Sequence, residues 1–233
     1  MNWGLTGVSI LTLALTACAS ISNEPSDGTT VNARSPLEAE GPYNLRVPKA
    51  HTAIIEDNSA GDSQFTGLYN TFEIKATILN SEVREALIRR QAQYYQWDQA
   101  QQNTEREKAI QELSSEATVF LSFSTPERKN DNMADKKSIW RVFLDVGGRR
   151  YVGQAKKDRR LIAELQALFP FHTRWNTPYM LTFPVGMTAI ESQTMKLTLT
   201  GPLGSRVLEF RSLGSTAPKP EVVEPTVEEP PAP

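Results

Sequence analysis

Short segments in which apolar and polar residues alternate recur along most of this chain, and they constrain its fold more than any other feature. The clearest segment spans residues 71–78, where every second side chain is apolar: Phe72, Ile74, Ala76 and Ile78. Successive side chains of a β-strand point to opposite faces of the sheet. A period of two therefore indicates a strand with one face in a core and the other in water.

The same alternation predicts strands at 119–123, 139–146, 179–185, 195–199 and around 208–210, with turn residues between them. Pro184 cannot donate a ladder hydrogen bond, so the 179–185 strand either lies at a sheet edge or ends there. About seven short strands predict a mostly β protein, an antiparallel β-sandwich. This strand pattern resembles the immunoglobulin-like sandwiches of bacterial surface proteins, without the Cys–Trp–Cys signature of true immunoglobulin domains. The resemblance assigns no functional residues.

One hairpin can be predicted residue by residue. The strand at 139–146 stops at Gly147 and Gly148, and glycine meets the positive φ angles of a tight two-residue turn without strain. With that turn, the opposed positions are Val146 with Arg149, Asp145 with Arg150 and Leu144 with Tyr151. The pairing places opposite charges across from each other, which supports the register.

Residues 81–114 change to a helical period and predict a helical insertion after the first clear strand. Asn80 or Ser81 can cap its start. A second start signal, the capping-box sequence from Thr104 to Glu107, lies inside it. Either one helix runs from about 82 to 114 or two helices meet near 101–103, and we favour two.

Two further elements are expected. A short helix is predicted at about 158–169, with Asp158 as its cap and Pro170 at its end. The first ordered element is expected at 52–55. The Gln-rich aromatic stretch 91–97 is interpreted as a helix surface that packs on the sheet, with a partner-binding face as the alternative.

Near the start of the chain, an uncharged apolar run at residues 5–17 leads into the only cysteine, Cys18. This run suits the apolar region of a signal peptide, because a membrane-spanning helix needs about 20 residues. The tetrapeptide Leu15-Thr16-Ala17-Cys18 resembles the lipobox of bacterial lipoproteins. The resemblance implies that residues 1–17 are removed as a signal peptide and that the Cys18 thiol carries the lipid, with palmitate-type acyl chains. The alternative is that Cys18 is an ordinary thiol in a signal peptide cut elsewhere.

The rest of the chain divides by composition. Residues 18–48 show no period and are expected to form a flexible tether, residues 49–213 the β-sandwich domain, and residues 214–233 a disordered tail rich in Pro and Glu. Residue 19 is Ala, where the lipoprotein family uses Asp for inner-membrane retention. The analogy favours the outer membrane and leaves open the periplasmic or the surface face.

The charge distribution is uneven. Residues 128–160 contain eleven Lys and Arg and four Asp, a net charge of +7, whereas residues 19–66 have a net charge of −4. Six basic residues follow the hairpin turn: Arg149, Arg150, Lys156, Lys157, Arg159 and Arg160. We interpret them as a candidate contact for an anionic partner, either lipid headgroups or an acidic protein. The alternative is a solvated hairpin tip and helix start.

The sequence shows no catalytic or metal-binding motif. Its two histidines, His51 and His172, are far apart and lack the spacing of a zinc site, and no Gly-x-Ser-x-Gly motif is present. The single cysteine excludes an intramolecular disulfide. We therefore expect no catalytic residues, no metal and no cofactor.

These features favour a non-catalytic function. We expect a membrane-anchored lipoprotein of the bacterial envelope that acts as a binding or structural adaptor. Its partner would be an envelope protein or an anionic headgroup, and nucleic acid is not expected. The alternative is a periplasmic ligand-binding or hydrolytic domain with a cleft between the sandwich and the 81–114 insertion.

Overall fold

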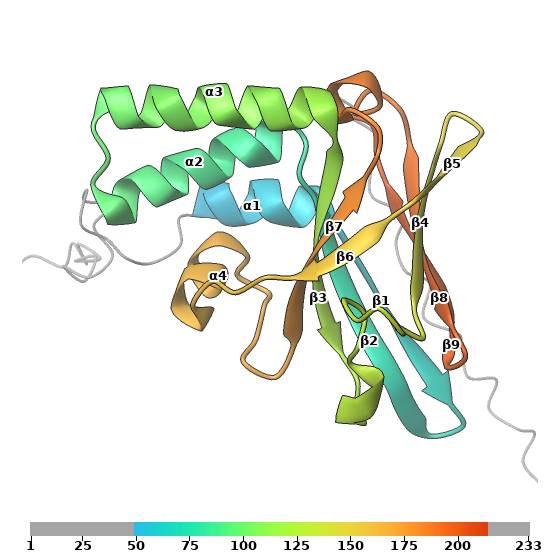
Figure 1. The fold of residues 1–233 in the computed structure, drawn as a ribbon. Helices are drawn as coiled ribbons and strands as arrows, with labels where there is room; N and C mark the ends of the chain where they lie inside the picture. Colours follow the sequence, from blue (N-terminus) through green and yellow to red (C-terminus); the bar gives the residue numbers. More distant parts are fainter. Residues whose placement is uncertain (1–48, 214–233) are drawn as a thin grey trace, which may run out of the picture.

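Nine strands within residues 49–213, the part of the chain that the computed structural model describes, form two antiparallel sheets (Figure 1). Sheet A has the order β1 (Ser59–Thr66), β2 (Tyr69–Ile78), β3 (Ala117–Ser124), β7 (Thr177–Phe183) and β6 (Gln154–Lys157). Sheet B has the order β5 (Arg149–Val152), β4 (Arg141–Val146), β8 (Met195–Gly201) and β9 (Gly204–Phe210). The expectation of a mostly β, antiparallel fold is confirmed. The predicted signal peptide, Cys18, the tether and the tail lie outside the described residues.

The inward faces of the two sheets enclose one apolar core. Its members include Ile74 and Leu121 from sheet A and Leu144 and Leu197 from sheet B, all at most 1% exposed. These residues occupy alternate positions of their strands, as the sequence period predicts. The alternating pattern therefore accounts for the core that the two sheets share.

In the described part of the chain, four α-helices accompany the sheets: α1 (Lys49–Asp57), α2 (Ser81–Tyr95), α3 (Gln99–Ser115) and α4 (Ile162–Leu168). In Figure 1 they gather on one side of sheet A. A second apolar cluster joins α1, α2 and α4 to its outer face, where Phe120 of β3 packs with Val83 of α2 and Leu168 of α4. Both faces of β3 are consequently buried. Among the described residues, no helix is long and apolar enough to cross a bilayer.

The insertion between β2 and β3 contains two helices, as we favoured, but they meet at residues 96–98 and not near 101–103. Gln96 has φ 54° and ends α2 in the left-handed conformation. The Asp98 side chain caps α3 by accepting a hydrogen bond from the Gln101 backbone. The Thr104 start signal is wrong, because Thr104 already lies inside α3 and its hydroxyl donates to the Ala100 carbonyl.

One other expectation needs correction, and two strands were missed. Strands β1 and β6 were not predicted, whereas the first ordered element, expected at 52–55, is present as part of helix α1. The cap assigned to Asp158 is wrong, because α4 begins at Ile162 and the Asp158 carboxylate instead accepts hydrogen bonds from the backbone and guanidinium of Arg160. The remaining expected strands are present, and β7 ends at Phe183, immediately before Pro184.

The predicted hairpin is confirmed in full. Val146, Asp145 and Leu144 lie opposite Arg149, Arg150 and Tyr151. Gly147 and Gly148 have φ angles of 56° and 75°.

The strand that leaves this hairpin then changes sheets at Gly153, because β5 pairs with β4 in sheet B and β6 pairs with β7 in sheet A. A Cβ atom at Gly153 would lie 2.5 Å from Phe183 Cε1 and 2.8 Å from Val142 Cγ2. The chain can pass between the two sheets here because this residue has no side chain.

Candidate functional site

The six basic residues singled out in the sequence do not form one patch. Arg149 and Arg150 lie at the β4–β5 hairpin, whereas Lys156, Lys157, Arg159 and Arg160 lie at the far end of β6 and before α4. At about 3.3 Å per residue, the strand from Arg149 to Lys157 spans up to roughly 25 Å. Figure 1 shows β5 extending away from the helices while β6 leads toward α4.

Two of the six are engaged by neighbouring side chains. Arg150 makes a bidentate contact with Asp145, at 2.7 and 2.9 Å. Arg160 donates to Asp158, with a shortest distance of 2.6 Å, and its side chain is only 29% exposed. The hydrogen bond from Arg150 lowers the pKa of Asp145. These two arginines therefore have local structural roles.

Four of the six remain available on the surface, and three of them are close together in the chain, whereas Arg149 lies at the β4–β5 hairpin. Lys156, Lys157 and Arg159 are exposed, and none of the salt bridges among residues 49–213 involves them. Leu161 and Ile162 follow them immediately in the chain and are 76% and 42% exposed. We call these five residues the β6–α4 surface. It combines positive charge with exposed aliphatic side chains.

The sequence did not reveal the aliphatic part of this surface. In the helix predicted at about 158–169, the spacing of Leu161, Ile162, Leu165 and Leu168 would place these four side chains on one face. Only Leu165 and Leu168 are buried, because α4 begins later than predicted and has seven residues. The late start leaves Leu161 outside the helix.

A buried polar site was also missed. The structure brings together Ser122 and His172, with Ser122 Oγ 2.9 Å from His172 Nδ1, and Asn176 donates to the same oxygen. Ser122 is 0% and His172 is 1% exposed, and burial lowers the pKa of His172. A nucleophile needs access to its substrate, so this geometry favours a structural role that holds the loop before β7 against β3.

The space between α2 and sheet A is filled by apolar side chains. Val83 and Leu87 of α2 pack with Leu79 and with Phe120 of β3. These residues occupy the position in which the alternative hypothesis placed a ligand cleft. Within residues 49–213, no group of three or more His, Cys, Asp or Glu side chains is arranged to hold a metal ion.

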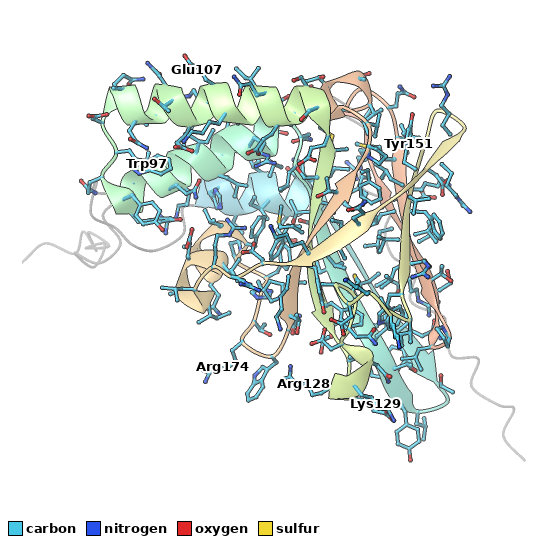
Figure 2. All side chains as sticks on the ribbon, viewed as in Figure 1. Trp97, Glu107, Arg128, Lys129, Tyr151 and Arg174 are labelled. Carbon is cyan, nitrogen blue, oxygen red and sulfur yellow. The ribbon has the colours of Figure 1, made fainter. Side chains whose placement is uncertain are left out.

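The aromatic stretch at the end of α2 is partly packed and partly exposed. Tyr94 packs against the outer cluster of sheet A, whereas Tyr95 is 50% exposed. The rings of Tyr95 and Trp97 stack at 5.8 Å. Figure 2 shows Trp97 at the end of the helical layer, away from the sheets.

No protein-family model matches the chain, and no curated protein or solved structure is significantly similar to it.

Proposed function

We propose that this chain is a membrane-anchored lipoprotein of the bacterial envelope that acts as a non-catalytic adaptor, with the β6–α4 surface as its contact for an acidic envelope protein. The observation that carries the partner assignment is the group of free cations Lys156, Lys157 and Arg159 beside exposed Leu161 and Ile162. The lipobox resemblance at residues 15–18 supports the anchor, and Ala19 supports the outer membrane.

The composition of the β6–α4 surface favours a protein partner. Protein interfaces combine an apolar centre with a polar rim, and complementary charge selects the partner and accelerates its encounter. The exposed aliphatic pair supplies the apolar part, and the three cations supply the charge. An acidic surface with a shallow apolar depression would complement both.

The immunoglobulin-like classification of the sandwich belongs to the same proposal. Two antiparallel sheets around one core support it. An experimental structure whose strand connections differ from those of immunoglobulin domains would contradict it.

The anchor is tested by metabolic labelling with a clickable fatty acid. Wild-type protein should carry the label and the Cys18→Ala variant should not. Label that persists in the Cys18→Ala variant contradicts lipidation at this residue.

The partner contact is tested by native pull-down from solubilised envelopes with the full-length protein. The variant Lys156→Glu/Lys157→Glu/Arg159→Glu should lose the partner that wild type retains. Arg149→Glu, at the start of β5 in the other sheet, is the control and should keep it. Recovery of no envelope partner by the wild type, together with a monomeric native species, contradicts the adaptor function.

A further inference from the structure

Exposed aromatic and apolar side chains gather at one end of sheet A. Phe65, Leu68 and Tyr69 stand at the tip of the β1–β2 hairpin and are 55%, 98% and 81% exposed. Trp175, in the loop before β7, is 71% exposed. Large apolar side chains exposed together in this way usually mark an interaction site, whereas single ones are ordinary.

The strand register brings these residues to the same end of the molecule. β2 begins at Tyr69 and runs antiparallel to β3, which ends at Ser124, and Thr177 at the start of β7 lies opposite Phe123. The Thr125 hydroxyl donates to the Thr71 carbonyl at 3.1 Å and so ties the loop after β3 to the hairpin. Figure 1 shows the β1–β2 hairpin, the short helical turn after β3 and the loop before β7 at the lower end of the molecule.

Basic side chains lie at the same end of the molecule (Figure 2). Figure 2 shows Arg128, Lys129 and Arg174 along this same end. The side chains of Arg128 and Lys129 are 72% and 79% exposed. Arg128 Nη1 lies 4.0 Å from Asp131 Oδ2, and Lys129 Nζ lies 2.8 Å from Glu127 Oε2 in a pair that is itself open to solvent. The guanidinium of Arg174 lies 5.8 Å from the Trp175 ring. Segments 64–71, 125–130 and 170–176 together contain three basic residues and one acidic residue, Glu127, a net charge of +2.

We propose that this end of the sandwich binds the interface of an anionic phospholipid bilayer. We call it the strand-end surface and define it by the apolar residues Phe65, Leu68, Tyr69 and Trp175 and the basic residues Arg128, Lys129 and Arg174. Trp and Tyr favour the headgroup level of a membrane, where one part of the ring is in an apolar medium and the polar part stays in water. The basic residues complement anionic headgroups.

The form of the surface distinguishes a bilayer from a protein partner. Leu68 and Trp175 lie in separate loops and are 98% and 71% exposed. Each side chain can therefore enter a fluid interface independently of the other. The β6–α4 surface lacks this aromatic component, which is why we assign different partners to the two surfaces.

This inference goes beyond the proposed function and does not require lipidation of Cys18. One acyl chain or one basic patch binds membranes reversibly, whereas two signals together give stable attachment. In an anchored protein, the strand-end surface would therefore hold the domain against the bilayer and fix which surfaces face away from it.

The experiment measures binding of the full-length Cys18→Ser protein to vesicles, so that no acyl chain contributes. Vesicles of mixed phosphatidylglycerol and phosphatidylcholine are compared with vesicles of phosphatidylcholine alone, by flotation. The segments before residue 49 are common to all variants, so differences between variants report the folded surfaces. Circular dichroism and thermal unfolding verify that each variant is folded.

Two strand-end variants are compared with two matched controls on the β6–α4 surface. The strand-end variants are Leu68→Ser/Tyr69→Ser/Trp175→Ser and Arg128→Glu/Lys129→Glu/Arg174→Glu, and the controls are Leu161→Ser/Ile162→Ser and Lys156→Glu/Lys157→Glu/Arg159→Glu. Each strand-end variant should bind anionic vesicles about tenfold more weakly or worse, since one basic residue alone contributes about fivefold. The controls should bind like the Cys18→Ser protein.

Three results would overturn the proposal. The first is that the strand-end variants bind anionic vesicles as tightly as the Cys18→Ser protein does. The second is that the control variants lose as much affinity for these vesicles as the strand-end variants lose. Sedimentation velocity could show a dimer that the strand-end variants dissociate, which would assign the surface to a second copy of the chain. None of these results depends on whether Cys18 is lipidated or on which partner the pull-down recovers. The membrane contact of the strand-end surface and the adaptor function of the β6–α4 surface can therefore fail separately.

Discussion

Ser122 Oγ and His172 Nδ1 lie 2.9 Å apart where both residues are buried from solvent. The other ring nitrogen, His172 Nε2, has no hydrogen-bond partner within the described part of the chain. His51 is buried as well, and its Nε2 donates to the Leu168 carbonyl at 2.8 Å. The two histidines thus fasten α4 and the following loop, one to α1 and the other to β3.

We expect the folded domain to lose stability as the pH falls below about 6.5. Burial lowers the pKa of both His51 and His172, and for His51 it outweighs the hydrogen bond to Leu168. In the unfolded chain both have the ordinary pKa of about 6.5. The unfolded state therefore binds more protons below that pH, and the free energy of unfolding falls with the pH. The stabilisation from the two neutral, buried histidines is complete above about pH 6.5. It is lost as the pH falls through the lowered pKa values that these histidines have in the folded state. Urea unfolding from about pH 4.5 to about pH 8 measures this dependence.

The double variant His51→Gln/His172→Gln is the control. It should be less stable than wild type at about pH 8, because two buried contacts change, but its stability should vary less between about pH 5 and about pH 7. Carboxylates such as Asp145, whose pKa Arg150 lowers, titrate at lower pH. An unchanged slope in the double variant would assign the acid sensitivity to other groups.

A substitution at Gly153 tests whether the chain can cross from sheet B to sheet A only where the residue has no side chain. The Cβ of Gly153→Ala would meet Phe183 and Val142 at distances that real contacts do not allow, so we expect a loss of about 1–3 kcal/mol in the free energy of unfolding. Phe183→Leu in the same chain should recover part of this loss, and a double-mutant cycle measured by urea unfolding gives the coupling. Strictly additive effects would contradict the proposed clash.

The sequence predicted local features best. The register of the β4–β5 hairpin depends only on the turn Gly147-Gly148 and the alternation before it, and every opposed pair is correct. Strand β1 was missed because its sequence, SAGDSQFT, is mostly polar and pairs at an edge through its backbone. Thr104 has the residue types of a capping box, but Asp98 had already capped the helix six residues earlier.

The candidate surfaces were harder to predict than the strands. The basic residues at 149–160 are close in sequence, yet the strand between them separates the two ends. The strand-end surface shows the reverse case, because Leu68, Arg128 and Trp175 are remote in sequence and meet only through the pairing of β2, β3 and β7. A sequence pattern reports neighbours along the chain, and these sites depend on neighbours across a sheet.

Relief of backbone strain at Gln96 should stabilise the protein. Gln96 is the one non-glycine residue with positive φ among residues 49–213, and glycine adopts this conformation without a steric penalty. We expect Gln96→Gly to raise the free energy of unfolding by about 0.5–1 kcal/mol. Gln111→Gly, in the exposed interior of α3, should lower it by about 1 kcal/mol. Equal losses in both variants would show that the left-handed conformation carries no strain.

Asp131 joins the loop after β3 to strand β7, beneath the strand-end surface. Its carboxylate accepts a hydrogen bond from the Thr177 hydroxyl at 2.5 Å and from the Tyr179 hydroxyl at 2.8 Å. Both donors belong to residues that are at most 4% exposed. Burial, with a further contribution from Asp131, raises the pKa of the Tyr179 hydroxyl, so it remains a donor at neutral pH.

We expect Asp131→Ala to lower the free energy of unfolding by about 1–3 kcal/mol, because it leaves two buried hydroxyls without their acceptor. Asp131→Asn keeps one carbonyl acceptor and should cost less. Urea unfolding measures both variants. Tryptic cleavage after Arg128 and Lys129 should also accelerate in Asp131→Ala before global unfolding, because the loop loses its attachment to β7. If cleavage at these sites kept the wild-type rate while stability fell, Asp131 would stabilise the sandwich without positioning the basic residues of the strand-end surface.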